Sequence, residues 1–384
     1  MTLDQVLSRS YLVGGSVRDE LLGLAVHERD WVVVGCTEDE ILSAGFTRLD
    51  LEFPVFLHPE TKEEYALARR EKQSGEGYRG FQIDIQNVSL EEDLLRRDLT
   101  INAMVRDTNG ELIDKHDGVS DLKDGLLRHV TEAFADDPIR LLRVARFAAQ
   151  LGSRFRVSHK THKLMRQMVA DRVISQITPQ RLGREIEKAF NGQHPWRFFE
   201  VLAGCGALAQ WLPEFMGELS GETHSKGQKS VALAALQKAS ERSDRSDIRF
   251  AVFMLTGKTD VKNLLSVAEL PKRLTELAQD LIEHLQGRDV NHFTDNDWVR
   301  LFEEAQLWLA NDKSDKRWQV VELMIQDAAL ADALLQVKEA VIAINRDTLD
   351  DHALSGKALG EAIKQQKRDT ILRMLDKVIQ HGSH

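Results

Sequence analysis

The feature that most constrains this sequence is the stretch of residues 11–35, which reads YLVGGSVRDELLGLAVHERDWVVVG. Two short runs, 11–13 and 31–34, are rich in β-branched and aromatic residues and predict strands. Between them a glycine pair is followed by the short helical pattern of residues 17–22, which ends at Gly23. The stretch therefore predicts a strand, a tight turn into a helix, and a second strand.

The turn after the first predicted strand contains Gly14 and Gly15. Glycine lets the backbone approach an anion closely, and the free N–H groups of a helix N-terminus suit a phosphate. Arg18, in the first helical turn, would add a charge-assisted contact. A glycine pair by itself is more often only a tight turn, so a phosphate site needs support from the residues that follow.

Two carboxylates, Glu28 and Asp30, stand at the start of the second predicted strand. Residues i and i+2 of a strand point to the same face, so we expect both carboxylates to converge at one strand end, opposite the glycine turn. Paired carboxylates beside phosphate donors suit phosphoryl transfer with a divalent metal ion. A solvated pair at a strand edge would explain these two residues alone, but the order of strand, glycine turn, helix, strand and carboxylates is far more specific.

Four segments in this order resemble the class II tRNA nucleotidyltransferases of the DNA polymerase β-like superfamily: GGSVRD (14–19), ERDWVVVG (28–35), RRDLTINAM (96–104) and DDPIRLLRVARF (136–147). The segments HPETKEEYALARRE (58–71) and GYRGF (77–81) resemble the bacterial CCA-adding branch more than its poly(A) polymerase relatives. The resemblance covers about residues 10–215, and what it implies for single residues follows below.

In the first two segments, the resemblance implies that Gly15 and Arg18 bind the nucleotide triphosphate and that Glu28 and Asp30 hold Mg²⁺ as the catalytic pair. The family usually has aspartate at the first metal position, where this chain has Glu28. The extra methylene moves the oxygens outward by about one carbon–carbon bond. Since the carboxylate itself is kept, we expect activity to be retained.

The third segment supplies Arg97, which by the same resemblance would contact the nucleotide. Its neighbours Asp98 and Asn102 would shape the ribose side of the pocket.

In the fourth segment, the resemblance assigns nucleotide binding to Asp137, Arg140, Arg143 and Arg146. Asp137 and Arg140 would meet the edge of the incoming base, because C and A share an exocyclic amine beside a ring acceptor, which a carboxylate and a guanidinium can match. We expect these two residues side by side at i and i+3 of a helix. Arg146 would then lie nearly opposite Asp137, so a phosphate contact or a structural ion pair suits it better. The family's Glu-Asp opening is Asp136-Asp137 here, a mild change.

The pattern along the chain predicts an α+β fold. We expect a polymerase β-like nucleotidyltransferase head with a mixed or antiparallel sheet and helices at residues 1–135, and a helical neck with the nucleotide-selecting motif at 136–215. Leucine- and alanine-rich helices continue from there, so residues 216–384 are predicted to be an all-helical body and tail that holds tRNA.

Relatives of this branch often carry a second metal centre, an HD domain built around a His-Asp dipeptide. Residues 248–258 resemble the place where that dipeptide would stand, and the dipeptide is absent there. The pair His116-Asp117 lies in the head within DKHDG, where a solvated turn is the better reading. Four histidines of the C-terminal half show no ligand spacing: His224, His284, His292 and His352. We therefore expect no phosphohydrolase activity.

Composition limits the cellular compartment and the binding partners expected for this chain. No apolar run approaches eighteen residues, the N-terminus has no secretory pattern, and two distant cysteines form no disulfide framework. A cytoplasmic protein without membrane contact is the expectation. The net charge of −10 looks wrong for an RNA-binding protein, but arginines cluster in the N-terminal half, and local patches govern binding.

Taken together, the sequence predicts a Mg²⁺-dependent enzyme that adds CCA to the 3′ end of tRNA from CTP and ATP, releasing pyrophosphate. Three enzyme alternatives stay open: addition of CC only, addition of A only, and poly(A) synthesis. The loop of residues 73–80 would decide between full and partial addition. A non-catalytic RNA-binding remnant is the alternative from another class, against which both carboxylates, both glycines and the DDPIR segment argue.

Overall fold

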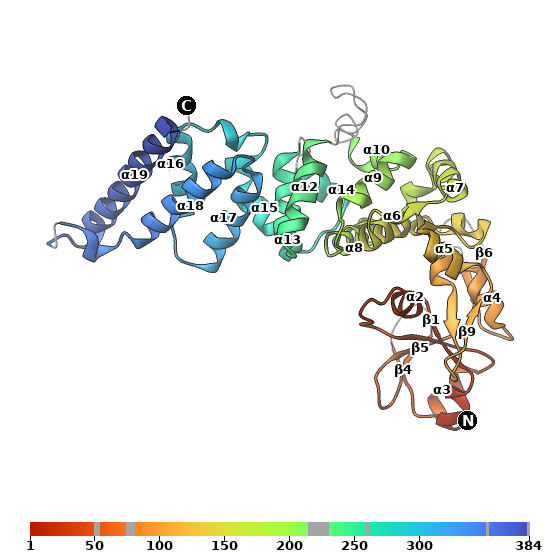
Figure 1. The fold of residues 1–384 in the computed structure, drawn as a ribbon. Helices are drawn as coiled ribbons and strands as arrows, with labels where there is room; N and C mark the ends of the chain where they lie inside the picture. Colours follow the sequence, from red (N-terminus) through yellow and green to blue (C-terminus); the bar gives the residue numbers. More distant parts are fainter. Residues whose placement is uncertain (50–53, 74–80, 214–229, 258–260, 351–352, 382–384) are drawn as a thin grey trace. The chain divides into compact units, whose positions relative to one another are not determined.

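A computed structural model of the chain describes residues 1–49, 54–73, 81–213, 230–257, 261–350 and 353–381 (Figure 1). It divides into two compact units. The first contains Met1–Glu185 and Arg197–Gln210, and the second contains Ile186–Trp196 and Trp211–His384.

The first unit is built on a mixed seven-stranded sheet with strand order β3-β4-β5-β2-β1-β8-β9. Only the β2–β5 pairing is parallel, and the other neighbours are antiparallel. The strands are β1 (Ser10–Val13), β2 (Asp30–Val33), β3 (Thr47–Arg48), β4 (Val55–Leu57), β5 (Glu64–Leu67), β8 (Met104–Arg106) and β9 (Leu112–Asp114). Two small ribbons join β6 (Arg70–Gln73) to β7 (Phe81–Asp84) and β10 (Leu126–Leu127) to β11 (Arg156–Val157).

Short helices flank this sheet, and their ends follow local capping rules. Ser89 opens α4 with a reciprocal capping box, in which its hydroxyl accepts from the Glu92 N–H and the Glu92 carboxylate accepts from the Ser89 N–H. The Ser-x-x-Glu pattern of residues 89–92 predicts such a helix start. The helices of the head are α1 (Leu3–Leu7), α2 (Gly15–Leu21), α3 (Glu38–Ser43), α4 (Leu90–Leu95), η2 (Thr100–Asn102), α5 (Gly118–Asp124) and η3 (Glu132–Asp136).

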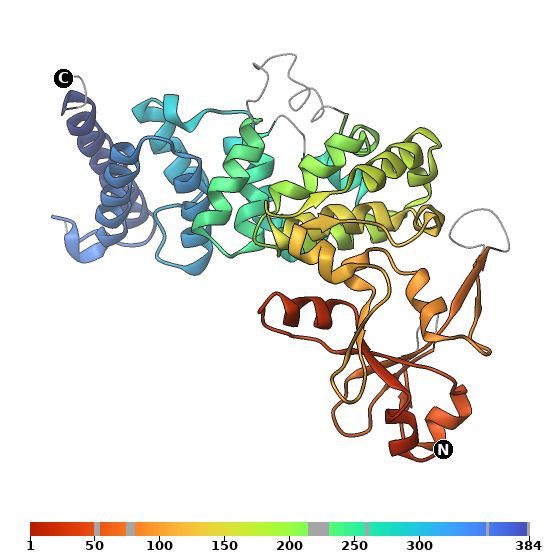
Figure 2. The ribbon, with the colours of Figure 1, turned by 45° about the vertical axis from the view of Figure 1, so that its right-hand side comes forward.

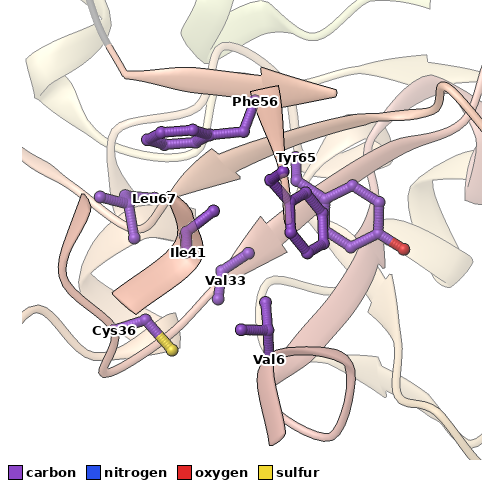
Figure 3. Packing of buried hydrophobic residues seen from close by; sticks show 8 residues of the cluster. Val6, Val33, Cys36, Ile41, Phe56, Tyr65 and Leu67 are labelled. Carbon is purple, nitrogen blue, oxygen red and sulfur yellow. The ribbon is translucent and has the colours of Figure 1, made fainter. Parts of the chain in front are cut away.

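Both faces of the sheet are buried around β2. Val33 belongs to one apolar cluster, shown in Figure 3 with Val6, Cys36, Ile41, Phe56, Tyr65 and Leu67. Val32, its neighbour on the opposite face, belongs to a second cluster with Val13, Leu94 and Val105. Because side chains alternate along a strand, Asp30 lies on the same face as Val32. Apolar packing on both faces thus fixes the strand whose first residue is one of the predicted catalytic carboxylates.

Apart from the short strand β11, the regular structure of the rest of the first unit is helical, as predicted for the neck. A helix begins at Pro179, as its position after Thr178 indicates. The neck helices are α6 (Ile139–Leu151), α7 (His159–Ala170), η4 (Val173–Gln176), α8 (Pro179–Phe190), α9 (Trp196–Cys205) and α10 (Leu208–Trp211). The divisions between the two units fall inside α8, inside α9 and inside α10. Most of the head and neck thus lie in the first unit. The predicted boundaries at 135 and 215 stay predictions.

Helices make up all the regular structure of the second unit in its described residues (Figure 2, green to blue). α13 packs against α12, α15 and α17. The helices are α12 (Val231–Arg242), α13 (Ser246–Thr256), α14 (Val261–Val267), α15 (Lys272–Leu285), η5 (Val290–His292), α16 (Asp295–Glu304), α17 (Asp312–Met324), α18 (Ala328–Ala343), η6 (Arg346–Thr348) and α19 (Gly356–His381). An α+β chain is confirmed. Among the described residues, none of the helices is long and apolar enough to span a membrane.

An arginine occupies the core of the second unit where the sequence comparison expects a His-Asp pair in related proteins. Arg249 on α13 is 2% exposed. Its guanidinium donates to the carbonyl oxygens of Ser243 at 2.6 Å, Gly192 at 2.8 Å and Phe190 at 3.3 Å. These bonds connect α13 to the end of α8 and the residues that follow it. Arg249 therefore has a structural role, because it joins separate backbone segments. His224 and His352 lie outside the described residues.

Candidate active site

A hollow of about 730 Å³ lies in the first unit. Its lining includes all nine residues predicted to bind nucleotide or metal: Gly15, Arg18, Glu28, Asp30, Arg97, Asp137, Arg140, Arg143 and Arg146. Eight arginines and five carboxylates line it in all. Head and neck therefore contribute to one site that is rich in cations and has a local group of acids.

The glycine turn forms as predicted at the end of β1. Gly14 has φ +79°, a conformation that L side chains rarely adopt, and α2 begins at Gly15. A Cβ atom at Gly14 would lie 3.5 Å from a guanidinium nitrogen of Arg97. Glycine is therefore required here by the backbone conformation, and it keeps the chain close to an arginine of the hollow.

The two predicted metal carboxylates line the hollow together, but one is not on the strand. β2 begins at Asp30, and Glu28 lies in the segment before it. The expectation that both are strand residues is wrong, for a topological reason. β1 ends at Val13, which pairs with Asp30, and the chain then leaves the sheet at Gly14, so residues before Asp30 have no antiparallel partner on that side.

Burial and neighbouring charges of both signs act on the pKa of Asp30. Burial raises the pKa of Asp30 although the residue remains accessible to solvent, the charge of Glu28 raises it further, and Arg97 opposes both. Mg²⁺ needs only one or two carboxylates when substrate phosphates and waters complete its shell. The two-carboxylate donor set therefore fits such an ion. No cluster of three His, Cys, Asp or Glu residues able to hold a metal exists among the described residues.

A third carboxylate, Glu64, lies beside this pair. It is in register with Asp30 across the parallel β2–β5 pairing. Burial raises the pKa of Glu64, and the charges of Asp30 and Glu28 add to the effect. Sequence reasoning missed this neighbour, since the pairing of the second and fifth strands leaves no local signal.

A chain of hydrogen bonds links the arginines of head and neck through the third motif. Arg18 donates to the amide oxygen of Asn102 at 2.7 Å, and Asn102 donates to Asp98 at 3.0 Å. Arg143 donates to the other oxygen of Asp98 at 2.5 Å. Burial favours the neutral acid, but Arg143 and the bond from Asn102 outweigh it and hold the pKa of Asp98 well below its usual range. Asp98 is thus an ionised anchor between α2 and α6.

Asp137 and Arg140 both line the hollow, but Asp137 is not a helix residue. It follows the last residue of η3, with φ −115° and ψ 107°, and α6 begins at Ile139. The prediction that the two residues share a helix is wrong at Asp137, because Pro138 takes the cap position. The Asp137 carboxylate instead pairs with Arg181 of α8 at 3.0 Å. Arg140 donates to the carbonyl oxygen of Ala133 at 2.6 Å.

Arg146 makes the ion pair that its position on the helix indicated. It donates to Glu185 of α8 at 2.6 Å, and both side chains are buried. Arg69, Arg181 and His27 also line the hollow, and sequence reasoning did not select them. The signal for Arg181 would have been a second basic helix that follows the fourth motif.

Comparison with known proteins gives the class of this fold and site. The family model "Poly A polymerase head domain" matches residues 10–128, and the model "Probable RNA and SrmB- binding site of polymerase A" matches residues 154–218. The fold is also that of a solved tRNA nucleotidyltransferase complexed with a primer tRNA and an incoming ATP analog. The TM-score is 0.64 at 23% identity, over 88% of this chain and 98% of that one.

Curated relatives narrow the class to a family. A CCA-adding enzyme of Pseudomonas putida strain W619 is 39% identical over 371 residues, 94% of this chain and 97% of that protein. A multifunctional CCA protein of Thioalkalivibrio sulfidiphilus is 52% identical over 251 residues, 63% of this chain and 61% of that protein's length. The chain belongs to the CCA-adding enzymes, which confirms the family that the four motifs indicated.

Proposed function

We propose that this CCA-adding enzyme completes tRNA at the hollow of its first unit, where nucleotidyl groups from CTP and ATP are transferred to the tRNA 3′-hydroxyl and pyrophosphate leaves. One observation carries the proposal: nine residues chosen from separate motifs line a single hollow. Two carboxylates and an array of guanidinium groups are what nucleotidyl transfer from a triphosphate requires.

The acidic part of the hollow would hold Mg²⁺ on Glu28 and Asp30. When bound, the ion activates the attacking hydroxyl and stabilises charge on the phosphate oxygens. Asp30 is fixed by the end of the β1–β2 pairing, while Glu28 lies before the strand and outside that pairing. We therefore assign the more exact positioning to Asp30, and we expect the longer Glu28 to adjust around the ion.

The basic part would hold the triphosphate. Arg18 and Arg143 reach the hollow from α2 and α6, and the anchor Asp98 sets the position of Arg143 directly and that of Arg18 through Asn102. Charge-assisted bonds from guanidinium groups to phosphate are strong and directional. Groups that are already held in place need no reorganisation when charge develops on the leaving pyrophosphate.

Base selection would come from Asp137 and Arg140. A carboxylate accepts from the exocyclic amine shared by C and A, and a guanidinium donates to the adjacent ring nitrogen. U and G present a carbonyl oxygen where C and A present the amine. Asp137 would meet that oxygen with like charge, so both residues together select C and A.

A basic surface on the neck would hold the RNA. Residues 152–184 contain eight lysines and arginines and one acid, in a chain of net charge −10. On α7, Lys160, Lys163 and Arg166 are exposed at three-residue spacing, and none has an ion-pair partner within the described part of the chain. Unpaired cations in a row suit the phosphate backbone of tRNA. This surface lies within the region matched by the RNA-binding family model.

The cytoplasm is the compartment we propose, where free thiols such as Cys36 and Cys205 persist. Arg249 of α13 is hydrogen-bonded to backbone carbonyl oxygens in the segment where relatives often carry the His-Asp pair. We therefore also propose that the second unit performs no phosphohydrolysis.

Truncated tRNA that lacks its terminal nucleotides tests the function. It would be incubated with labelled CTP and ATP, separately and together, and the products sized. Addition of three nucleotides with both substrates is expected. Arrest after CC, addition of a single A to tRNA ending in CC only, or a long A tail would each replace the proposal by one of the partial or polymerase activities. No product in any mixture would indicate an RNA-binding remnant.

A further inference from the structure

One aromatic ring in the hollow is surrounded by three arginines. The guanidinium carbons of Arg146, Arg18 and Arg143 lie 4.1, 5.2 and 5.6 Å from the centre of the Phe147 ring. Phe147 is 4% exposed and lines the hollow. Arg143 and Phe147 share a face of α6 at i and i+4, whereas Arg18 comes from α2. The ring thus joins cations from two elements.

Three cations so close together repel one another unless the surroundings offset the repulsion. Each has its own carboxylate: Asp19 lies 2.8 Å from Arg18, Asp98 lies 2.5 Å from Arg143, and Glu185 lies 2.6 Å from Arg146.

Besides its own acid, each of the three guanidinium groups has the Phe147 ring as a neighbour. An aromatic ring carries negative charge density on its faces, and a guanidinium within about 6 Å of its centre is attracted by that density. An aliphatic side chain of similar size would fill the space without this attraction.

We propose that Phe147 is a positioning residue that holds these three guanidinium groups as a fixed array and thereby sets the affinity of the site for the triphosphate of both substrates. The inference rests on the proposed role of the arginines in nucleotide binding. The ring acts on cations that would bind the triphosphate, the part that CTP and ATP have in common. Its effect is therefore the same for CTP and ATP.

Two substitutions of Phe147 separate the charge density of the ring from its volume. Phe147→Met keeps most of the volume and removes the ring, and Phe147→Tyr keeps the ring. We expect Phe147→Met to raise the KM of CTP and of ATP about tenfold each, since one such contact is worth about 1–2 kcal/mol when desolvated. Because the lost contact serves ground state and transition state alike, kcat should change little. Phe147→Tyr should stay within about twofold of the wild type.

A graded series removes the objection that Phe147→Met only loosens the fold. Phenylalanine with increasing fluorination at position 147 keeps the shape of the ring while its faces lose negative charge density. We expect KM for both nucleotides to rise stepwise with fluorination at unchanged melting temperature. Phe56→Leu, in the apolar core of the head, serves as the matched control: it should lower the melting temperature and leave KM unchanged.

The outcomes distinguish this inference from the function on which it rests. If Arg18→Ala and Arg143→Ala leave KM for nucleotides unchanged, the assignment of the arginines to the triphosphate fails. If those variants raise KM but the fluorinated series is flat, or Phe147→Tyr is as impaired as Phe147→Met, the positioning role of the ring is overturned. A change in the ratio of CTP to ATP use in the Phe147 variants would also overturn it.

Discussion

The carboxylate of Asp137 is held by Arg181, whose Nη2 atom donates to both of its oxygens at 3.1 and 3.0 Å. The two residues are 44 positions apart in the chain, and they come from the turn before α6 and from α8. Asp137 is the residue proposed to read the incoming base. Its orientation is thus determined by a neighbouring helix as well as by its own backbone.

Arg181→Ala should therefore relax base selection. Without this partner, the Asp137 carboxylate can rotate. It then no longer repels the carbonyl oxygen that U and G present where C and A have the exocyclic amine. The loss of one charged hydrogen-bond partner costs about 1–3 kcal/mol, so discrimination against UTP and GTP should fall by about tenfold or more. Incorporation of each single nucleotide into truncated tRNA measures it. Arg184→Ala, at an exposed position of the same helix, is the control. A slower enzyme with unchanged discrimination would contradict a role for Arg181 in selection.

Asp30→Asn should inactivate the enzyme and yet stabilise its metal-free form at neutral pH. The pKa of Asp30 is raised in the folded protein, first by burial and then by Glu28. The contribution of Asp30 to the free energy of unfolding is favourable below the pKa of the unfolded state. It is lost as the pH rises through the pKa of the folded state. At pH 7 the ionised carboxylate therefore destabilises the fold, and asparagine removes that effect.

Denaturant unfolding in the presence of a chelator measures this difference. The variant should exceed the wild type in free energy of unfolding at pH 7, and the gap should close below about pH 3.5, where both forms are neutral. Glu111→Gln, at an exposed turn, should show no such gap. An Asp30→Asn protein less stable than the wild type at pH 7 would contradict the prediction that the ionised carboxylate destabilises the fold.

Lys160→Glu combined with Lys163→Glu should weaken tRNA binding without affecting chemistry. Each phosphate contact that is lost reduces the salt dependence of binding by a slope of about 0.7–0.9. We expect KM for tRNA to rise about tenfold or more, with KM for CTP unchanged. A filter-binding titration over a range of salt measures the slope. Lys115→Glu, an exposed lysine of the head, is the charge-matched control, and an equal effect from that variant would show that only total charge matters.

Arg249→Met should destabilise the second unit. The carbonyl oxygens of Ser243, Gly192 and Phe190 would lose a buried donor, and such losses cost about 2–4 kcal/mol in total. Chemical unfolding measures the change. Arg245→Met, exposed just before the same helix, should cost about 0.5 kcal/mol or less. An Arg249→Met protein as stable as the wild type would show that the buried guanidinium is not a structural tie.

Local spacing in the sequence was enough to predict the elements that carry the site. The glycine turn, the capping box at Ser89 and the start of α8 at Pro179 each follow from interactions within a few residues. The short β-branched and aromatic runs of the strands and the long helical patterns are equally local. All of these agree with the structure because no distant partner is needed to define them.

What the sequence could not supply is the pairing between distant segments. Glu64 lies beside Asp30 only because β5 pairs with β2 in parallel, and Glu28 is left off the strand because β1 ends at Val13. The pair Asp137–Arg181 depends on how α8 packs. Such contacts are set by tertiary packing, so periodicity and propensity carry no trace of them.

The most direct test of the catalytic centre is a single-turnover measurement with Asp30→Ala. Enzyme in excess over truncated tRNA would be mixed with labelled CTP and Mg²⁺, and binding of the same tRNA measured in parallel. We predict that incorporation falls by at least about a thousandfold while the Kd for tRNA stays within about threefold of the wild type, because removing a group that stabilises the transition state costs about 4 kcal/mol or more. Incorporation at the wild-type rate would contradict the assignment of the acidic pair as the catalytic centre.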